Sequence, residues 1–79
     1  MGIATTEEEL ADKVSRFIKA ELKRAGITYA ELAERLKEHG LAETEASIKA
    51  KLKRGTFPAT FMLAVVAAIG LAEIALEDL

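Results

Sequence analysis

The basic residues of this sequence are its best candidates for chemistry, because ammonium and guanidinium groups donate charge-assisted hydrogen bonds to phosphate and carboxylate oxygens. All eleven of them lie between positions 13 and 54. Six acidic residues share that stretch, which leaves it a net charge of +5, whereas the whole chain carries −2. Between positions 46 and 55 there are four basic residues and no acidic one. Since solvated faces usually mix charge signs, this pattern favours a surface that binds an anionic partner.

Residue types that support catalysis or metal binding are scarce. The chain has no cysteine, one histidine, no glycine-rich phosphate loop and no nucleophile elbow. His39, close to the end of a predicted helix, is interpreted as a solvated or dipole-compensating residue. The acidic run from Glu7 to Glu9 spreads over the first turn of another predicted helix, where capping explains it. We therefore expect no enzymatic activity, no catalytic residue, no metal site and no cofactor.

Threonines and glycines mark the helices that must position the basic residues. Thr6 with Glu9, and Thr28 with Glu31, have the spacing of capping boxes, in which hydroxyl and carboxylate each satisfy a free backbone amide. Thr44 starts a third helix in the same way, and glycines end four of the helices. The predicted helices cover about residues 7–24, 29–39, 45–54, 58–69 and 72–78.

These elements predict a single all-α domain over residues 1–79, a compact bundle of about five short helices. The longest apolar run, residues 61–72, has 12 residues, whereas a membrane span needs roughly 20. The first 12 residues hold four acidic groups, where a signal peptide needs positive charge. A chain without cysteine also suits a reducing compartment. We therefore expect a cytoplasmic protein with no membrane partner.

The predicted helix 45–54 has an apolar and a polar side. Ile48 and Leu52, four residues apart, are its inward anchors. A step of about 100° per residue then defines the outward positions. These are Ala46, Ser47, Ala50, Lys53 and Arg54, with Lys49 on the flank.

The predicted helix over residues 59–69 is apolar almost all round, which indicates burial on more than one side. Two arrangements satisfy this pattern. The helix forms either the centre of a closed monomeric bundle or, together with the acidic C-terminal tail, the interface of a homodimer.

Several segments resemble the bacterial and phage helix-turn-helix domains of the lambda-repressor and Cro type. Residues 22–28 resemble the end of that family's first helix and the start of its second, and residues 31–33 match its Glu-Leu-Ala core. Residues 53–55 with Pro58 resemble the end of its recognition helix, and residues 61–71 resemble its apolar fourth helix.

More narrowly, residues 28–33, 44–48 and 54–57 resemble a short family of uncharacterised bacterial domains related to these regulators. The resemblance covers roughly residues 10–76. From Leu32 to Gly55 the chain is several residues longer than the repressor pattern. We therefore expect a lengthened turn between the second and third helices, or a longer third helix.

The resemblance implies a DNA-binding module of the transcription-regulator type. Its helix 45–54 would enter the major groove, while Thr28 and Tyr29, at a helix start, would rest on a phosphate. The residues implied to contact DNA are Thr28, Tyr29, Ser47, Lys49, Lys53 and Arg54. The alternative is a protein–protein interaction or adaptor module of the same fold, whose basic side meets an acidic protein.

Overall fold

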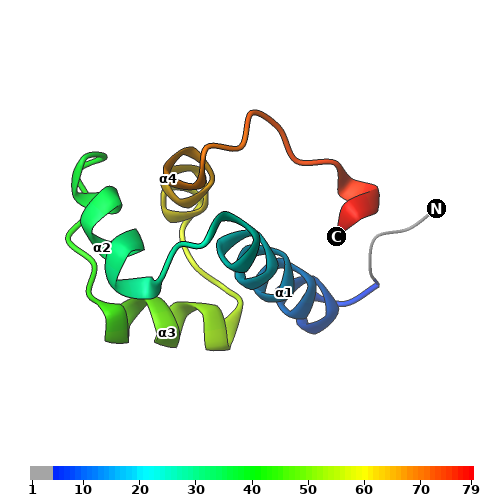
Figure 1. The fold of residues 1–79 in the computed structure, drawn as a ribbon. Coiled ribbons are helices and arrows are strands. Elements are labelled where there is room, and N and C mark those ends of the chain that lie inside the picture. The colour runs from blue at the N-terminus through cyan, green and yellow to red at the C-terminus, as the bar shows by residue number, and fades with distance from the viewer. Residues whose placement is uncertain (1–4) are drawn as a thin grey trace.

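The computed structural model describes residues 5–79, which form four α-helices and a short 3₁₀ turn (Figure 1). The elements are α1 (Glu7–Ala25), α2 (Tyr29–Lys37), α3 (Glu45–Arg54), α4 (Ala59–Ile69) and η1 (Leu76–Asp78). The predicted all-α class is confirmed for the described residues, and four predicted helices begin and end within two residues of their expected bounds. Within residues 5–79, no single helix has the length and hydropathy needed to cross a membrane.

Threonine hydroxyls start the first three helices, as predicted. The Oγ1 atoms of Thr6, Thr28 and Thr44 accept the backbone N–H three residues later, at 3.1, 3.1 and 3.0 Å. The capping box predicted at Thr28 is complete, because the Glu31 carboxylate in turn accepts the Thr28 N–H at 3.4 Å. These caps satisfy amides that a helix cannot satisfy by itself, and they fix where each helix begins.

The capping box predicted at Thr6 is only half formed. The Glu9 carboxylate accepts hydrogen bonds from the hydroxyls of Thr5, at 2.8 Å, and Thr6, at 3.2 Å, instead of from a backbone amide. These bonds, that from Thr5 first, lower the pKa of Glu9 below its ordinary value of 4.5. The hydroxyl of Thr5, one residue before the N-cap, therefore holds the Glu9 carboxylate away from the backbone amide of Thr6.

Apolar side chains from all four helices meet in one core. The largest fully buried ones are Ile18 of α1, Leu32 and Leu36 of α2, Ile48 and Leu52 of α3, and Phe61 and Val65 of α4. Both α1 and α2 pack against α3 and against α4. Figure 1 shows α3 along one side of the bundle and α4 on the other. Burying each such side chain contributes about 1.5–3 kcal/mol, so the core fixes α3 firmly.

The connection between α2 and α3 covers residues 38–44, and α3 itself has 10 residues. Leu41 packs half-buried against the core. Glu43 anchors the end of this connection to α3, because its carboxylate accepts the Ser47 hydroxyl at 2.7 Å and pairs with the Lys51 ammonium. The connection is therefore held in place at both its middle and its end.

The fifth helix predicted over residues 72–78 is absent, and that prediction was wrong. The chain after α4 is irregular up to the 3₁₀ turn η1, which has no side-chain cap. Leu76 stays 63% exposed, and the Lys13 ammonium donates to the Leu79 carbonyl at 3.3 Å. A short helix needs tertiary packing to offset its nucleation cost, and this tail buries too little apolar surface to provide it.

Candidate nucleic-acid interface

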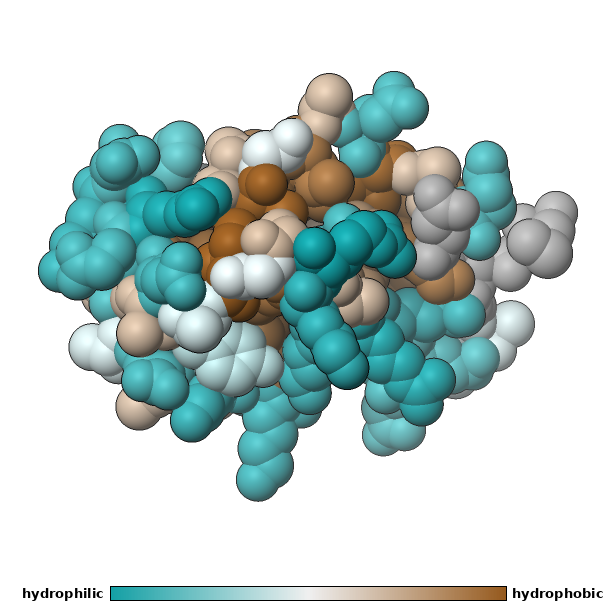
Figure 2. Space-filling view, in the orientation of Figure 1, coloured by the Kyte–Doolittle hydropathy of each residue, from teal (hydrophilic) through white to brown (hydrophobic). Residues whose placement is uncertain are grey.

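The outer side of α3 is where the sequence places an anionic partner. Its exposed residues are Ala46, Lys49, Ala50, Lys53 and Arg54, with Glu45 exposed beside Lys49 at the start of the helix. Ile48 and Leu52 are 0% and 1% exposed, which confirms the predicted orientation of the helix. Figure 2 shows hydrophilic side chains projecting along the edge where α3 lies, while hydrophobic surface gathers toward the α4 side. The two alanines leave the middle of the cationic side flat.

The inner side of α3 is fixed by close contacts with α1. The buried hydroxyl of Ser15 donates to the Leu52 carbonyl at 2.6 Å, which satisfies one of the carbonyls left free at the end of α3. Gly55 ends α3 with a positive φ of 71°, and a Cβ there would lie 2.3 Å from the Ala11 carbonyl oxygen. Only glycine allows the two backbones this approach, so the end of α3 is set against α1.

Ser47, predicted to face outward and contact DNA, is half-buried and already bonded. Its hydroxyl accepts the Thr44 N–H at 2.8 Å and lies within donor distance of the Glu43 carboxylate, at 2.7 Å, and of the Thr44 carbonyl, at 3.0 Å. A hydroxyl has one proton to donate and two lone pairs. Ser47 therefore completes a capping box at the start of α3, and its proton is engaged there.

The basic residues of α3 differ in whether they contact other side chains of the protein. Lys49 lies 3.6 Å from the Glu45 carboxylate and 5.9 Å from the centre of the Tyr29 ring. Lys51 turns inward, where it pairs with Glu43 and lies 4.8 Å from the centre of the Phe61 ring. By contrast, no side chain among residues 5–77 and 79 forms an ion pair with Lys53 or Arg54, the exposed cations of the last turn.

The pair formed by Glu43 and Lys51 is largely withdrawn from solvent, with side chains 9% and 24% exposed. Burial alone would raise the pKa of the Glu43 carboxyl. The hydrogen bonds from Lys51 and Ser47 and the charge of Lys51 together outweigh it, so the pKa lies below the ordinary value of 4.5. The carboxylate is therefore ionised near neutral pH and holds Lys51 away from the outer side of α3.

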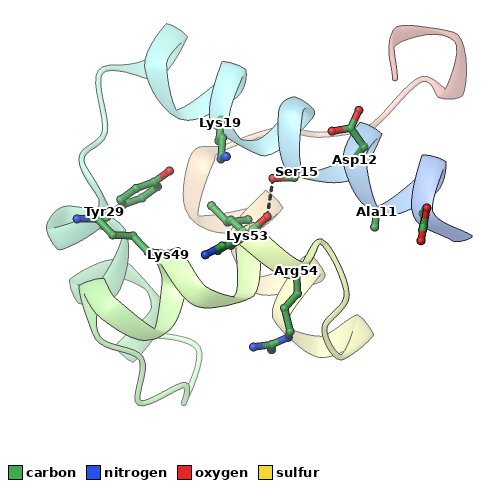
Figure 3. A pocket seen from close by; sticks show the side chains of 10 residues that line it. Ala11, Asp12, Ser15, Lys19, Tyr29, Lys49, Lys53 and Arg54 are labelled. Carbon is green, nitrogen blue, oxygen red and sulfur yellow. Dashed lines mark hydrogen bonds between the residues drawn. The ribbon is translucent and has the colours of Figure 1, made fainter.

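A groove of about 460 Å³ separates α1 from α3 and adds a cation that the sequence analysis did not include in the site. Lys19 of α1 lines this groove together with Tyr29, Lys49 and Lys53 (Figure 3). For Lys19, Lys23 and Arg24 the sequence alone favours a solvated face over contacts with a nucleic-acid backbone, because a charged outer face is the default for such a helix. Lys19 was therefore not predicted as a site residue. Its spacing of four from Lys23 was the available signal.

Thr28 and Tyr29 lie at the start of α2, as predicted. The Thr28 hydroxyl is engaged by Glu31, which already supplies a carboxylate to the helix terminus. Tyr29 is half-buried and lines the groove next to Lys49. Of the two residues, Tyr29 therefore has more capacity to meet a partner.

His39 is exposed in the turn after α2. Within the part of the chain that the structure describes, no group of three or more histidine, aspartate or glutamate side chains is arranged to hold a metal ion. The polar residues that converge are the cations of α3 and α1, and their arrangement can bind an extended anion through charge-assisted hydrogen bonds.

A family model described as Domain of unknown function (DUF6471) matches residues 10–74. This range covers most of α1 and all of α2, α3 and α4, so the outer side of α3 and the groove cations Lys19 and Lys23 lie within it. No curated protein and no solved structure matches the chain significantly.

Proposed function

We propose that the chain, which belongs to the DUF6471 family, is a repressor-like helix-turn-helix module that binds duplex DNA with the outer side of α3 in the major groove. It would act in the cytoplasm as a module of the transcription-regulator type. The observation that carries this proposal is the pair Lys53 and Arg54, which are exposed and form no ion pair with the described side chains of residues 5–77 and 79. Cations without protein partners are available to phosphates and to guanine edges.

The shape of α3 supports the same proposal. The major groove of B-DNA is wide enough to admit an α-helix. Ala46 and Ala50 keep the middle of the outer side free of bulky side chains, so the helix axis can approach the bases, and their methyl groups suit a thymine methyl. Lys49 adds charge on the flank, and Tyr29 offers a hydroxyl to the adjoining phosphate. With few groups that discriminate bases, we expect a Kd of roughly 10⁻⁴ to 10⁻⁶ M at physiological salt.

The test is a fluorescence-anisotropy titration of labelled random-sequence duplex DNA at several salt concentrations. The outer-side variant is Lys53→Gln/Arg54→Gln. The matched control is Arg24→Gln/Lys37→Gln, which also removes two exposed cations, each paired with a glutamate three residues earlier. We expect the outer-side variant to weaken binding and to lower the slope of log affinity against log salt by about 2, because each lost phosphate contact removes about 1. The control should leave the slope unchanged.

Two results would contradict the proposal. One is no binding by the wild-type chain even at low salt, and the other is an equal loss in the outer-side and control variants. In the first case the same cations are better assigned to an acidic protein surface, and the adaptor function becomes the reading to pursue.

The exposed side of α4 supports a homodimer, the partner expected from the sequence. Leu63 is 70% exposed there, while Phe61 and Val65 on the same helix are buried. Because α4 lies across the bundle from α3 (Figure 1), two copies can pair through α4 and still present both α3 helices. Light scattering after size-exclusion chromatography tests this arrangement, with Leu63→Glu expected to return a dimer to a monomer. A monomeric wild-type chain at micromolar concentration would contradict it.

A further inference from the structure

Two grooves adjoin each other along α1 and share three side chains. The first, of about 460 Å³, lies between α1 and α3, and the second, of about 380 Å³, lies where α1 ends and α2 begins. Lys19, Tyr29 and Lys49 line both of them. The two grooves therefore adjoin at these three side chains, and we call them together the α1 track.

The charge of the α1 track changes sign along its length. Lys19 and Lys23 line the end near α2, together with Glu45, which pairs with Lys49 at 3.6 Å. Among residues 5–77 and 79, nothing forms an ion pair with Lys19 or Lys23. Glu8 and Asp12 line the opposite end on the α1 wall, across from Lys53 and Arg54 of α3. Figure 3 shows Lys19 and Tyr29 toward one end of the groove and Asp12 toward the other. A polyanion that follows the α1 wall therefore meets cations at one end and carboxylates at the other.

We infer that, when α3 lies in the major groove, one flanking DNA strand follows the α1 track with its phosphates against Lys19 and Lys23, and that Glu8 and Asp12 end this contact. The inference rests on the proposed function and specifies the path of the DNA strand. Sugar-phosphate strands border the major groove, so cations beside a helix inserted there meet phosphates and not base edges. The α1 track lies directly beside α3, since Lys49 and Lys53 form its other wall.

The acidic end keeps its charge despite an ion pair. Asp12 lies 3.1 Å from Arg16, but the two side chains are 58% and 80% exposed, and such pairs are weak. Arg16 lines a different groove, with Phe17 and Leu79, and does not line the α1 track. The charge of Asp12 reaches over about 8 Å at physiological salt, far enough to repel a phosphate entering that end.

The test uses the same random-sequence duplex and the same salt series. Lys19→Gln/Lys23→Gln removes the cationic end, and Arg24→Gln/Lys37→Gln again serves as the control of equal charge change. Lysine and glutamine have similar helix propensities, and both positions are exposed, so the fold should persist. We expect the salt slope to fall by about 2 in the α1-track variant and to stay constant in the control.

A second pair of variants probes the acidic end. Glu8→Gln/Asp12→Asn should increase affinity at low salt, with the gain shrinking as salt rises. Glu38→Gln/Glu73→Gln, which removes two exposed acidic side chains from other parts of the surface, is the matched control and should show a smaller gain. Equal gains in the two variants would overturn the role of Glu8 and Asp12.

The outcomes separate this inference from the proposed function. If Lys53→Gln/Arg54→Gln weakens DNA binding but Lys19→Gln/Lys23→Gln behaves like the control, the path along α1 is wrong and DNA binding through α3 stands. If the wild-type chain binds no DNA at low salt, both are overturned. A loss in both variants with an unaffected control supports both.

Discussion

The inner side of α3 is packed against the rest of the bundle, whereas its outer side is exposed to solvent. On the inner side, Ile48 and Leu52 are fully buried, Ser15 satisfies a terminal carbonyl of the helix, and Gly55 brings the helix end against the backbone of α1. On the outer side, two alanines and three cations reach solvent. The contacts that position the helix therefore lie on its inner side, and its outer side chains face solvent.

The residues that position α3 and the residues proposed to bind DNA therefore lie on different sides of the helix. Substitutions on the inner side should change the free energy of unfolding, whereas Lys53→Gln/Arg54→Gln should change binding and leave the free energy of unfolding within about 0.5 kcal/mol. The following variants are ordered from the largest expected effect on stability to the smallest, and each can break the distinction.

The largest effect is expected at the contact between Gly55 and Ala11. Gly26→Ala is its matched control, because Gly26 has the same φ of 71° but nothing within 4 Å of an added Cβ. Both variants carry the strain of a positive φ, and only Gly55→Ala forces two backbones apart. We expect Gly55→Ala to lower the free energy of unfolding by at least about 2 kcal/mol more than Gly26→Ala, as measured by urea denaturation. Equal losses would show that the inner contact is not tight.

A smaller loss is expected for Ser15→Ala. The variant leaves the Leu52 carbonyl without its donor in a buried site, which costs about 1–3 kcal/mol. Arg16→Ala, the exposed neighbour on the same helix, should change the free energy of unfolding by under about 1 kcal/mol, since its ion pair with Asp12 is solvated. Thermal unfolding followed by circular dichroism ranks the two, and a reversed order would contradict the role of Ser15.

The smallest effect is expected at Glu43, on the boundary between the two sides. Its pKa is lowered in the folded chain, so the folded state favours the ionised carboxylate. The resulting stability is present above about pH 4.5 and is lost as pH falls through the lower pKa of the folded state. Glu43→Gln should therefore flatten the loss of stability below pH 4.5. The midpoints of urea denaturation, measured from neutral to acidic pH, check this prediction. The same pH dependence in Glu43→Gln and the wild-type chain would contradict it.

The bounds of α3 could be predicted because its signals are local. Thr44 and Gly55 sit at either end of it, and the spacing of Ile48 and Leu52 defines its buried side. The prediction of a fifth helix was wrong because it depended on packing with other elements, which local signals do not show. Apolar spacing over residues 72–78 shows that a helix could be amphipathic, but whether another element covers its apolar side is a property of the whole fold.

The positions of the candidate site residues could be predicted only where local signals define them. Lys53 and Arg54 follow from the helix angle and lie where it places them. Ser47 does not act as an outward residue, although its spacing of three from Thr44 offered the signal of a capping box. Lys19 depends on the packing of α1 against α3, which no local pattern encodes, so only the structure brings it to the groove.

Tyr29 gives the molecule an optical property of its own. It is the single tyrosine of a chain without tryptophan, so emission excited near the red edge of tyrosine absorption comes from one ring. That ring lines both grooves and has the Lys49 ammonium 5.9 Å from its centre. The intrinsic fluorescence of the unlabelled protein therefore originates at the surface proposed to receive DNA, where it can report the arrival of a partner without any attached dye.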